Sequence, residues 1–104
     1  MTALLPEFFS GLTGFQWDGG NAEKNWRRHR VTQTEAEQVI LNRPVVVASP
    51  APSVAEVRSF ALGQTDAGRR LMVVFTVRGA QVRVISARPM SRRERRIYAE
   101  AKGR

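Results

Sequence analysis

The stretch "LMVVFTVRGAQVRVISARP", residues 71–89, decides the fold of this chain. Its first seven residues form the most apolar run in the sequence, which predicts a central strand of a sheet. Gly79 and Ala80 then offer a two-residue loop suited to a type II′ turn, because glycine tolerates the positive φ that the first position requires. The residues after this loop again favour a strand, so the stretch predicts an antiparallel hairpin.

The tight loop fixes which residues of the two strands face each other. Thr76 would lie opposite Arg83, and Leu71 opposite Arg88. Because side chains alternate between the faces of a strand, Arg83 and Arg88 are expected on opposite faces of the sheet. Only a bulge, or a turn of the strand end at Pro89, would change this expectation.

The segments around the hairpin predict more strands and three helices. Short strands are expected at residues 14–17, 45–48 and 57–63. A first helix is expected within "NAEKNWRRHR", residues 21–30, where Ala22 and Trp26 form a narrow apolar stripe. Two further helices begin at capping boxes, "TQTE" at 32–35 and "SRRE" at 91–94, in which the first hydroxyl and the final glutamate cap each other's backbone amides.

These elements predict an α+β fold. A small antiparallel β-sheet would be packed with N-terminal helices and a basic C-terminal helix. Residues 1–13 are expected to be an irregular N-terminal extension, and residues 14–104 a single domain. At 104 residues the chain has room for one core but not for two.

Composition excludes several classes of protein. Hydrophobic residues make up 42% of the chain, yet no apolar run approaches the roughly 18 residues needed to cross a bilayer. The first residues lack the pattern of a secretory signal, so a soluble, non-exported domain is expected. The chain has no cysteine and one histidine, which excludes thiol catalysis and cysteine metal sites. No metal and no cofactor are therefore expected.

The net charge of +8, with seventeen Lys and Arg against nine Asp and Glu, indicates an anionic partner. Nucleic acid, an anionic membrane surface and an acidic protein are the usual choices, and the alternative is a basic surface that only confers solubility. Arginine outnumbers lysine, which favours bidentate contacts with phosphate. The cations crowd two segments, which contain Lys24, Arg27, Arg28 and Arg30, and Arg88, Arg92, Arg93, Arg95 and Arg96.

Four stretches carry a family resemblance. They are "FQWD" at 15–18, "NWRRHRV" at 25–31, "RRLMVVFTVRG" at 69–79 and "VRVISARPMSRRERRIY" at 82–98. In order and spacing they resemble the BrnT family of toxins, the ribonuclease partners of BrnA antitoxins in type II toxin–antitoxin systems. Departures from the family pattern occur at Asn21, where lysine is usual, at Arg30, where glycine is usual, at Gln64, and in the loop "SPAPSVAE".

The resemblance implies a RelE-like fold and RNA cleavage in the cytoplasm that inhibits translation. It also implies a BrnA-like antitoxin partner, a complex that represses its own promoter, and no membrane partner. DNA would be contacted only through the antitoxin, and the toxin could dimerise within the complex.

Metal-free RNA cleavage needs groups that move protons and groups that stabilise charge on the phosphate. His29 suits the proton work and lies in the segment that resembles the family's "KHG". Arg58, Arg83 and Arg88 lie on expected strands, where a rigid sheet could aim them at one phosphate. These four residues are the candidate catalytic set.

Each candidate has a structural alternative. His29 could only complement the dipole of a helix C-terminus, and Arg88 could form an ion pair with Glu94 or Glu35. Glu35 could serve as a base, although its capping box already accounts for it. Trp17 and Trp26 could stack on bases, with a core position as the default.

The remaining cations are expected to hold RNA or the antitoxin. This binding set is Lys24, Arg28, Arg30, Arg92, Arg93, Arg95 and Arg96. A protein of the same fold that binds nucleic acid or a partner without catalysis is the alternative function. A DNA repressor is a weaker reading, because no helix-turn-helix or ribbon-helix-helix pattern is visible.

Overall fold

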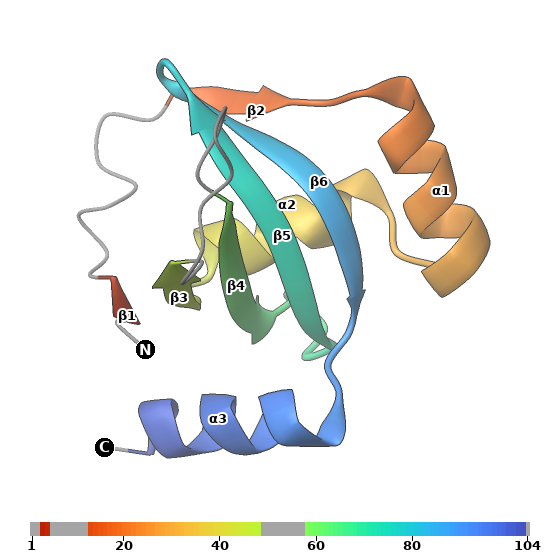
Figure 1. The fold of residues 1–104 in the computed structure, drawn as a ribbon. Helices are drawn as coiled ribbons and strands as arrows, with labels where there is room; N and C mark the ends of the chain where they lie inside the picture. The colour runs from red at the N-terminus through yellow and green to blue at the C-terminus, as the bar shows by residue number, and fades with distance from the viewer. Residues whose placement is uncertain (1–2, 5–12, 49–57, 104) are drawn as a thin grey trace.

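A computed structural model describes residues 3–4, 13–48 and 58–103, which form an α+β fold of one six-stranded sheet and three helices (Figure 1). The strand order is β1-β3-β4-β5-β6-β2. The elements are β1 Ala3–Leu4, β2 Gly14–Gln16, α1 Gly19–His29, α2 Gln33–Leu41, β3 Val45–Ala48, β4 Ser59–Gln64, β5 Arg70–Arg78, β6 Gln81–Pro89 and α3 Arg92–Lys102. None of the helices in these ranges is long and apolar enough to span a bilayer.

The sheet is mixed, whereas the sequence predicts an antiparallel one. Strand β2 pairs in parallel with β6, and the other neighbours are antiparallel. The error arises because β2 and β6 are far apart in the sequence, and no local signal carries their relative direction. Two residues of the expected irregular extension form β1, which pairs with β3.

The central strands are covered on both faces, which explains their continuous apolar sequence. Leu71, Val73 and Phe75 of β5 are fully buried in the core shared with α2. Met72 points to the opposite face and packs with Tyr98 of α3. Figure 1 shows α2 behind the sheet, with α3 lying across the end where β6 finishes.

Helix α3 covers only part of its face of the sheet. Tyr98 is its buried residue and Ile97 is half-buried, so the helix contributes a short apolar stripe. The other exposed positions of α3 are polar or small. Within the described residues, no helix covers this face at the end of the sheet nearest the β5–β6 turn.

Local signals placed the starts of α2 and α3 correctly. Thr32 caps α2 and Ser91 caps α3, each with the full reciprocal capping box. At α1, Asp18 is the N-cap, so Gly19 and Gly20, expected to form a turn, belong to the helix. Asp18 is a favoured N-cap residue because its carboxylate accepts the first free amides.

The β5–β6 turn has the expected geometry. Gly79 has a φ of 60°, and Ala80 does not have a positive φ. A type II′ turn requires this combination. Arg78 faces Gln81 across the loop. The glycine is therefore required by the backbone at this position.

The register between β5 and β6 shifts by one residue between Val74 and Phe75. Thr76 faces Arg83 as expected, but Arg88 faces Met72 instead of Leu71. The expected alternation is therefore wrong beyond the shift, where β6 has one extra residue.

The extra residue brings two arginines to the same face of the sheet. Val82, Val84 and Ala87 all lie in the core beneath α2, so the buried positions are spaced by two and then by three. Arg83 and Arg88 consequently both lie on the α3 face, where strict alternation would have separated them.

A buried asparagine holds the strand just after the shift. Asn25 of α1 is 2% exposed, and its Oδ1 accepts a hydrogen bond of 3.1 Å from the backbone amide of Ala87. Its Nδ2 group has no hydrogen-bond partner in the described part of the chain. Asn25 therefore satisfies a backbone donor that the bulged ladder does not, and it fixes α1 against β6.

Replacing this asparagine should destabilise the fold. We expect Asn25→Ala to lower the free energy of unfolding by about 1–3 kcal/mol, because the Ala87 amide is left buried without an acceptor. Urea unfolding at neutral pH measures the change. Arg27→Ala, which removes an exposed residue of the same helix, should change stability by less than about 0.5 kcal/mol. Equal effects of the two substitutions would contradict this role for Asn25.

Candidate active site

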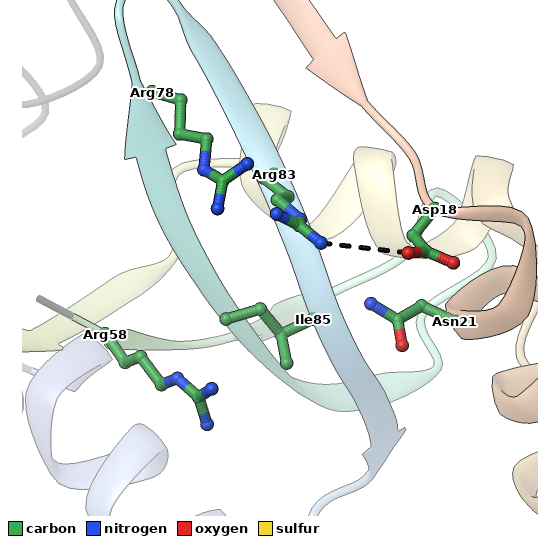
Figure 2. Close-up of a pocket in the computed structure, with 6 residues that line it drawn as sticks. All are labelled: Asp18, Asn21, Arg58, Arg78, Arg83 and Ile85. Carbon is green, nitrogen blue, oxygen red and sulfur yellow. Dashed lines mark ion pairs between the residues drawn. The ribbon is translucent and has the colours of Figure 1, made fainter. Parts of the chain in front are cut away.

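Three arginines line one pocket on the face of the sheet that α3 partly covers (Figure 2). Arg58 directly precedes β4, Arg78 is the last residue of β5, and Arg83 lies on β6. Alternation explains the convergence, because Arg78 and Arg83 share their face with Thr76, which pairs with Arg83. Arg58 lies two residues before Phe60, which also belongs to the α3 face.

These arginines line a pocket of about 370 Å³. Its other lining residues are Asp18 and Asn21 at the start of α1, and Ile85 of β6. Asp18 is the N-cap residue of α1, and its Oδ1 accepts a 2.8 Å hydrogen bond from the Gly20 amide. Asp18 Oδ2 lies 3.7 Å from Arg83 Nη2, an ion pair without a close hydrogen bond.

The pocket is suited to an anion. Among the described residues that line it, three carry a guanidinium group and one a carboxylate. Guanidinium groups bind phosphate through paired, charge-assisted hydrogen bonds. A phosphodiester is therefore the ligand that this arrangement fits best.

Arg88 lies on the same face but does not line the pocket. Both of its terminal nitrogens donate to the Glu94 carboxylate at 2.8 Å, so the expected alternative of an ion pair with Glu94 is present. Glu94 also caps Ser91 at the start of α3. Arg88 thereby joins the end of β6 to α3.

The surroundings of Glu94 favour its charged form. Partial burial acts to raise the pKa of the Glu94 carboxyl, but hydrogen bonds from Arg88 and the Ser91 backbone, with the charge of Arg88, outweigh it and hold the pKa below its ordinary value. The ion pair with Arg88 therefore contributes stability that depends on ionised Glu94.

His29 lies away from the arginine pocket. It is the last residue of α1, whereas Asn21 lines the pocket from the first turn. Eight residues of helix separate them by roughly 12 Å along the axis. The structure thus brings Arg58 and Arg83 of the candidate set together, and places His29 and Arg88 elsewhere.

Arg69 ties the end of α1 to the start of α2. It donates to the carbonyl oxygens of His29 at 2.9 Å and Arg30 at 2.7 Å, and forms an ion pair with Glu35 at 3.1 Å. Burial acts to raise the pKa of Glu35, but hydrogen bonds from the Thr32 backbone and Arg69 and the charge of Arg69 lower it overall. Glu35 therefore has the contacts of a structural carboxylate.

The two tryptophans differ in their surroundings. Trp17 packs against the core and donates through Nε1 to Glu37 at 2.8 Å. Trp26, by contrast, is 48% exposed, so its default assignment to the core is wrong. The guanidinium of Arg30 lies 5.1 Å from its ring centroid, a cation–π contact. Arg30 itself ends α1 with a φ of 54°, a conformation that favours glycine.

The remaining basic residues lie on exposed surfaces. Lys24 and Arg28 lie on the outer side of α1, and with Gly20, Glu23 and Arg27 they line a second pocket of about 290 Å³. The four arginines of α3 are exposed, and they are Arg92, Arg93, Arg95 and Arg96. Among the described residues, no group of three or more His, Asp or Glu side chains is placed to hold a metal ion.

Sequence reasoning missed three polar residues of the pocket. Asp18 was noted only as part of a motif, Asn21 only as a departure from the family pattern, and Arg78 was not singled out. Arg78 could have been found, because it lies two residues beyond Thr76, whose pairing with Arg83 was expected. The approach of Asp18 to the sheet depends on how α1 packs, which the sequence pattern does not show.

Comparisons with known proteins find one family and one similar fold. A family model described as "Ribonuclease toxin, BrnT, of type II toxin-antitoxin system" matches residues 17–94. The crystal structure of the Brucella abortus ribonuclease toxin BrnT is similar to this fold, with a TM-score of 0.58 and 21% sequence identity. That match covers 77% of this chain and 99% of the Brucella chain. No curated protein matches the sequence.

The Arg88 and Glu94 pair predicts a pH-dependent loss of stability. Because the pKa of Glu94 is lowered, the ion pair contributes fully to the stability of the fold above the ordinary carboxyl pKa of 4.5. This contribution is lost as the pH falls through the lower pKa of the folded state. We expect Glu94→Gln to cost about 1 kcal/mol at neutral pH, and the difference from the unchanged protein to shrink in acid.

Urea unfolding across this pH range measures the difference. Glu100→Gln, which removes an exposed carboxylate from the same helix, should cost less than about 0.5 kcal/mol at neutral pH. A Glu94→Gln effect that stays constant down to about pH 2 would rule out the ion pair as its source.

Proposed function

Because the chain belongs to the family of BrnT ribonuclease toxins of type II toxin–antitoxin systems, we propose that it cleaves RNA in the pocket formed by Arg58, Arg78 and Arg83. One observation carries this proposal, namely the convergence of three guanidinium groups from adjacent strands on one open pocket. A rigid sheet keeps such groups in place before the substrate arrives, which is what stabilisation of a transition state requires.

The proposed reaction needs no metal ion. The 2′ hydroxyl of the substrate attacks the neighbouring phosphorus, and the 5′ oxygen of the next nucleotide leaves. Negative charge accumulates on the phosphate oxygens during this step. Arginines aimed at those oxygens stabilise the charge in the transition state more than in the bound substrate, which raises kcat.

The roles of the four residues proposed from the sequence now differ. We assign charge stabilisation to Arg58 and Arg83, joined by Arg78. The contacts of Arg88 support a role in holding α3, and the distance of His29 from the pocket supports a role outside the chemical step. Single substitutions of these residues separate the roles.

An antitoxin partner and an RNA substrate follow from the family, and finer features are part of this proposal. We propose a BrnA-like antitoxin that covers the basic surface, cytoplasmic action, a RelE-like relationship of the fold, and a dimer within the complex. Complementary charge supports the docking proposal, because the α3 arginines form an exposed basic surface close to the sheet. Lys24, Arg28 and Arg30 are proposed to contact RNA outside the pocket.

Cleavage of total bacterial RNA by the purified protein in EDTA tests the catalytic proposal. We expect products with 5′-hydroxyl ends, and we expect Arg78→Ala and Arg83→Ala each to lower kcat by about 100-fold or more. Arg70→Ala is a matched control, because Arg70 is exposed on the same face of β5, eight residues and roughly 27 Å from Arg78. His29→Ala should retain most of the activity.

Two results would count against the proposal. Loss of cleavage in Arg70→Ala equal to that in Arg78→Ala would show that charge alone matters. No cleavage by the unchanged protein, despite RNA binding that weakens with salt, would favour a nucleic-acid-binding protein without catalysis on this fold.

Reversal of charge on α3 tests the antitoxin surface. We expect the double substitution Arg92→Glu and Arg96→Glu to abolish or strongly weaken complex formation, because like charges would then meet across the interface. Calorimetry with the acidic antitoxin measures the affinity. Arg27→Glu combined with Arg28→Glu makes the same change in net charge on exposed positions of α1, a different helix. Unchanged affinity after substitution of Arg92 and Arg96 would place the antitoxin elsewhere.

A further inference from the structure

The arginine pocket still needs a group that takes a proton from the 2′ hydroxyl. Arginine cannot do this, because its guanidinium stays protonated in proteins. Among the described residues that line the pocket, Asp18 is the one that carries a carboxylate. The other candidates from the sequence are placed elsewhere, since His29 ends α1 and Glu35 is bound to Arg69.

The two oxygens of Asp18 have separate surroundings. Oδ1 accepts from the Gly20 amide and caps α1, whereas Oδ2 faces Arg83. The side chain is half exposed, so a substrate can reach it. Figure 2 shows the carboxylate at the edge of the pocket, beside Arg83 and Asn21.

The spacing of Asp18 and Arg83 leaves room for a substrate oxygen. Oδ2 and Arg83 Nη2 are 3.7 Å apart, which is too long for a direct hydrogen bond. An oxygen placed at about 2.8 Å from each atom would complete hydrogen bonds to both. One substrate oxygen beside this pair can therefore bridge a proton acceptor and a positive charge.

We propose that Asp18 is the general base of the RNA cleavage proposed above, on which this inference rests. Oδ2 takes the proton of the 2′ hydroxyl while the 2′ oxygen forms its bond to phosphorus. The bond from phosphorus to the 5′ oxygen breaks, and that oxygen takes a proton from water. The hydroxide left behind receives the proton held by Asp18, so the products are a 2′,3′-cyclic phosphate and a 5′ hydroxyl.

Asp18→Asn separates this role from the capping of α1. Asparagine is as good an N-cap as aspartate and has nearly the same shape, so the helix should be retained. It cannot accept the proton at this position. The substitution also removes the negative charge from a pocket with three arginines, so RNA binding should be as tight as before or tighter.

The expected result is a split between turnover and binding. For Asp18→Asn, kcat should fall by about 100-fold or more, which is the usual contribution of a positioned base, while KM stays unchanged or falls. The melting temperature should match that of the unchanged protein. Glu23→Gln makes the same change in charge on the same helix and should leave kcat unchanged.

Three outcomes would overturn the assignment. Cleavage by Asp18→Asn at the rate of the unchanged protein would remove Asp18 from the chemical step, and loss of activity in Arg83→Ala would still support the proposed function. If kcat falls equally in Asp18→Asn and in Glu23→Gln, the loss comes from the change in charge and not from a base at Asp18. No cleavage by the unchanged protein would overturn both proposals.

Discussion

The register shift between β5 and β6 determines which side chains of β6 face α3 and which face the core beneath α2. One extra residue in β6 rotates everything beyond it to the other face, so Arg88 reaches α3 instead of the core beneath α2. The same strand presents Arg83 to the pocket before the shift. Asn25 stabilises this arrangement by accepting from the Ala87 amide, where the ladder is disturbed.

The arginines of this chain serve different purposes even though they look alike in the sequence. Arg69 and Arg88 bind carboxylates and backbone carbonyls and hold helices in place. Arg58, Arg78 and Arg83 line a pocket whose described lining also includes the carboxylate of Asp18. The net charge of the chain indicates an anionic partner, and the contacts distinguish arginines that hold helices from arginines that line a pocket.

Local signals in the sequence were enough for much of the fold. Both capping boxes and the Gly79 turn depend on residues a few positions apart, and each formed as expected. The parallel pairing of β2 and the bulge in β6 were not predicted, because both depend on partners far away in the chain. Strict alternation along a strand fails wherever a distant group, here Asn25, stabilises an irregular ladder.

The candidate site was partly predictable for the same reason. Arg58 and Arg83 could be proposed because strand residues have a defined direction, and their convergence follows from alternation. Asp18 reaches the pocket through the packing of α1 against β6, and Trp26 is exposed because α1 turns a different side to the sheet. Neither result follows from periodicity alone.

The gathering of Arg58, Arg78 and Arg83 also affects the protein as a folding chain. Positively charged side chains attract an anion, so an anion bound in this pocket would interact favourably with the folded state. Any ligand that binds only the folded state adds to its stability in proportion to the logarithm of its concentration. The substrate, or a partner that covers the pocket, would therefore also protect the protein from unfolding and proteolysis, and the unbound protein would have the shortest lifetime.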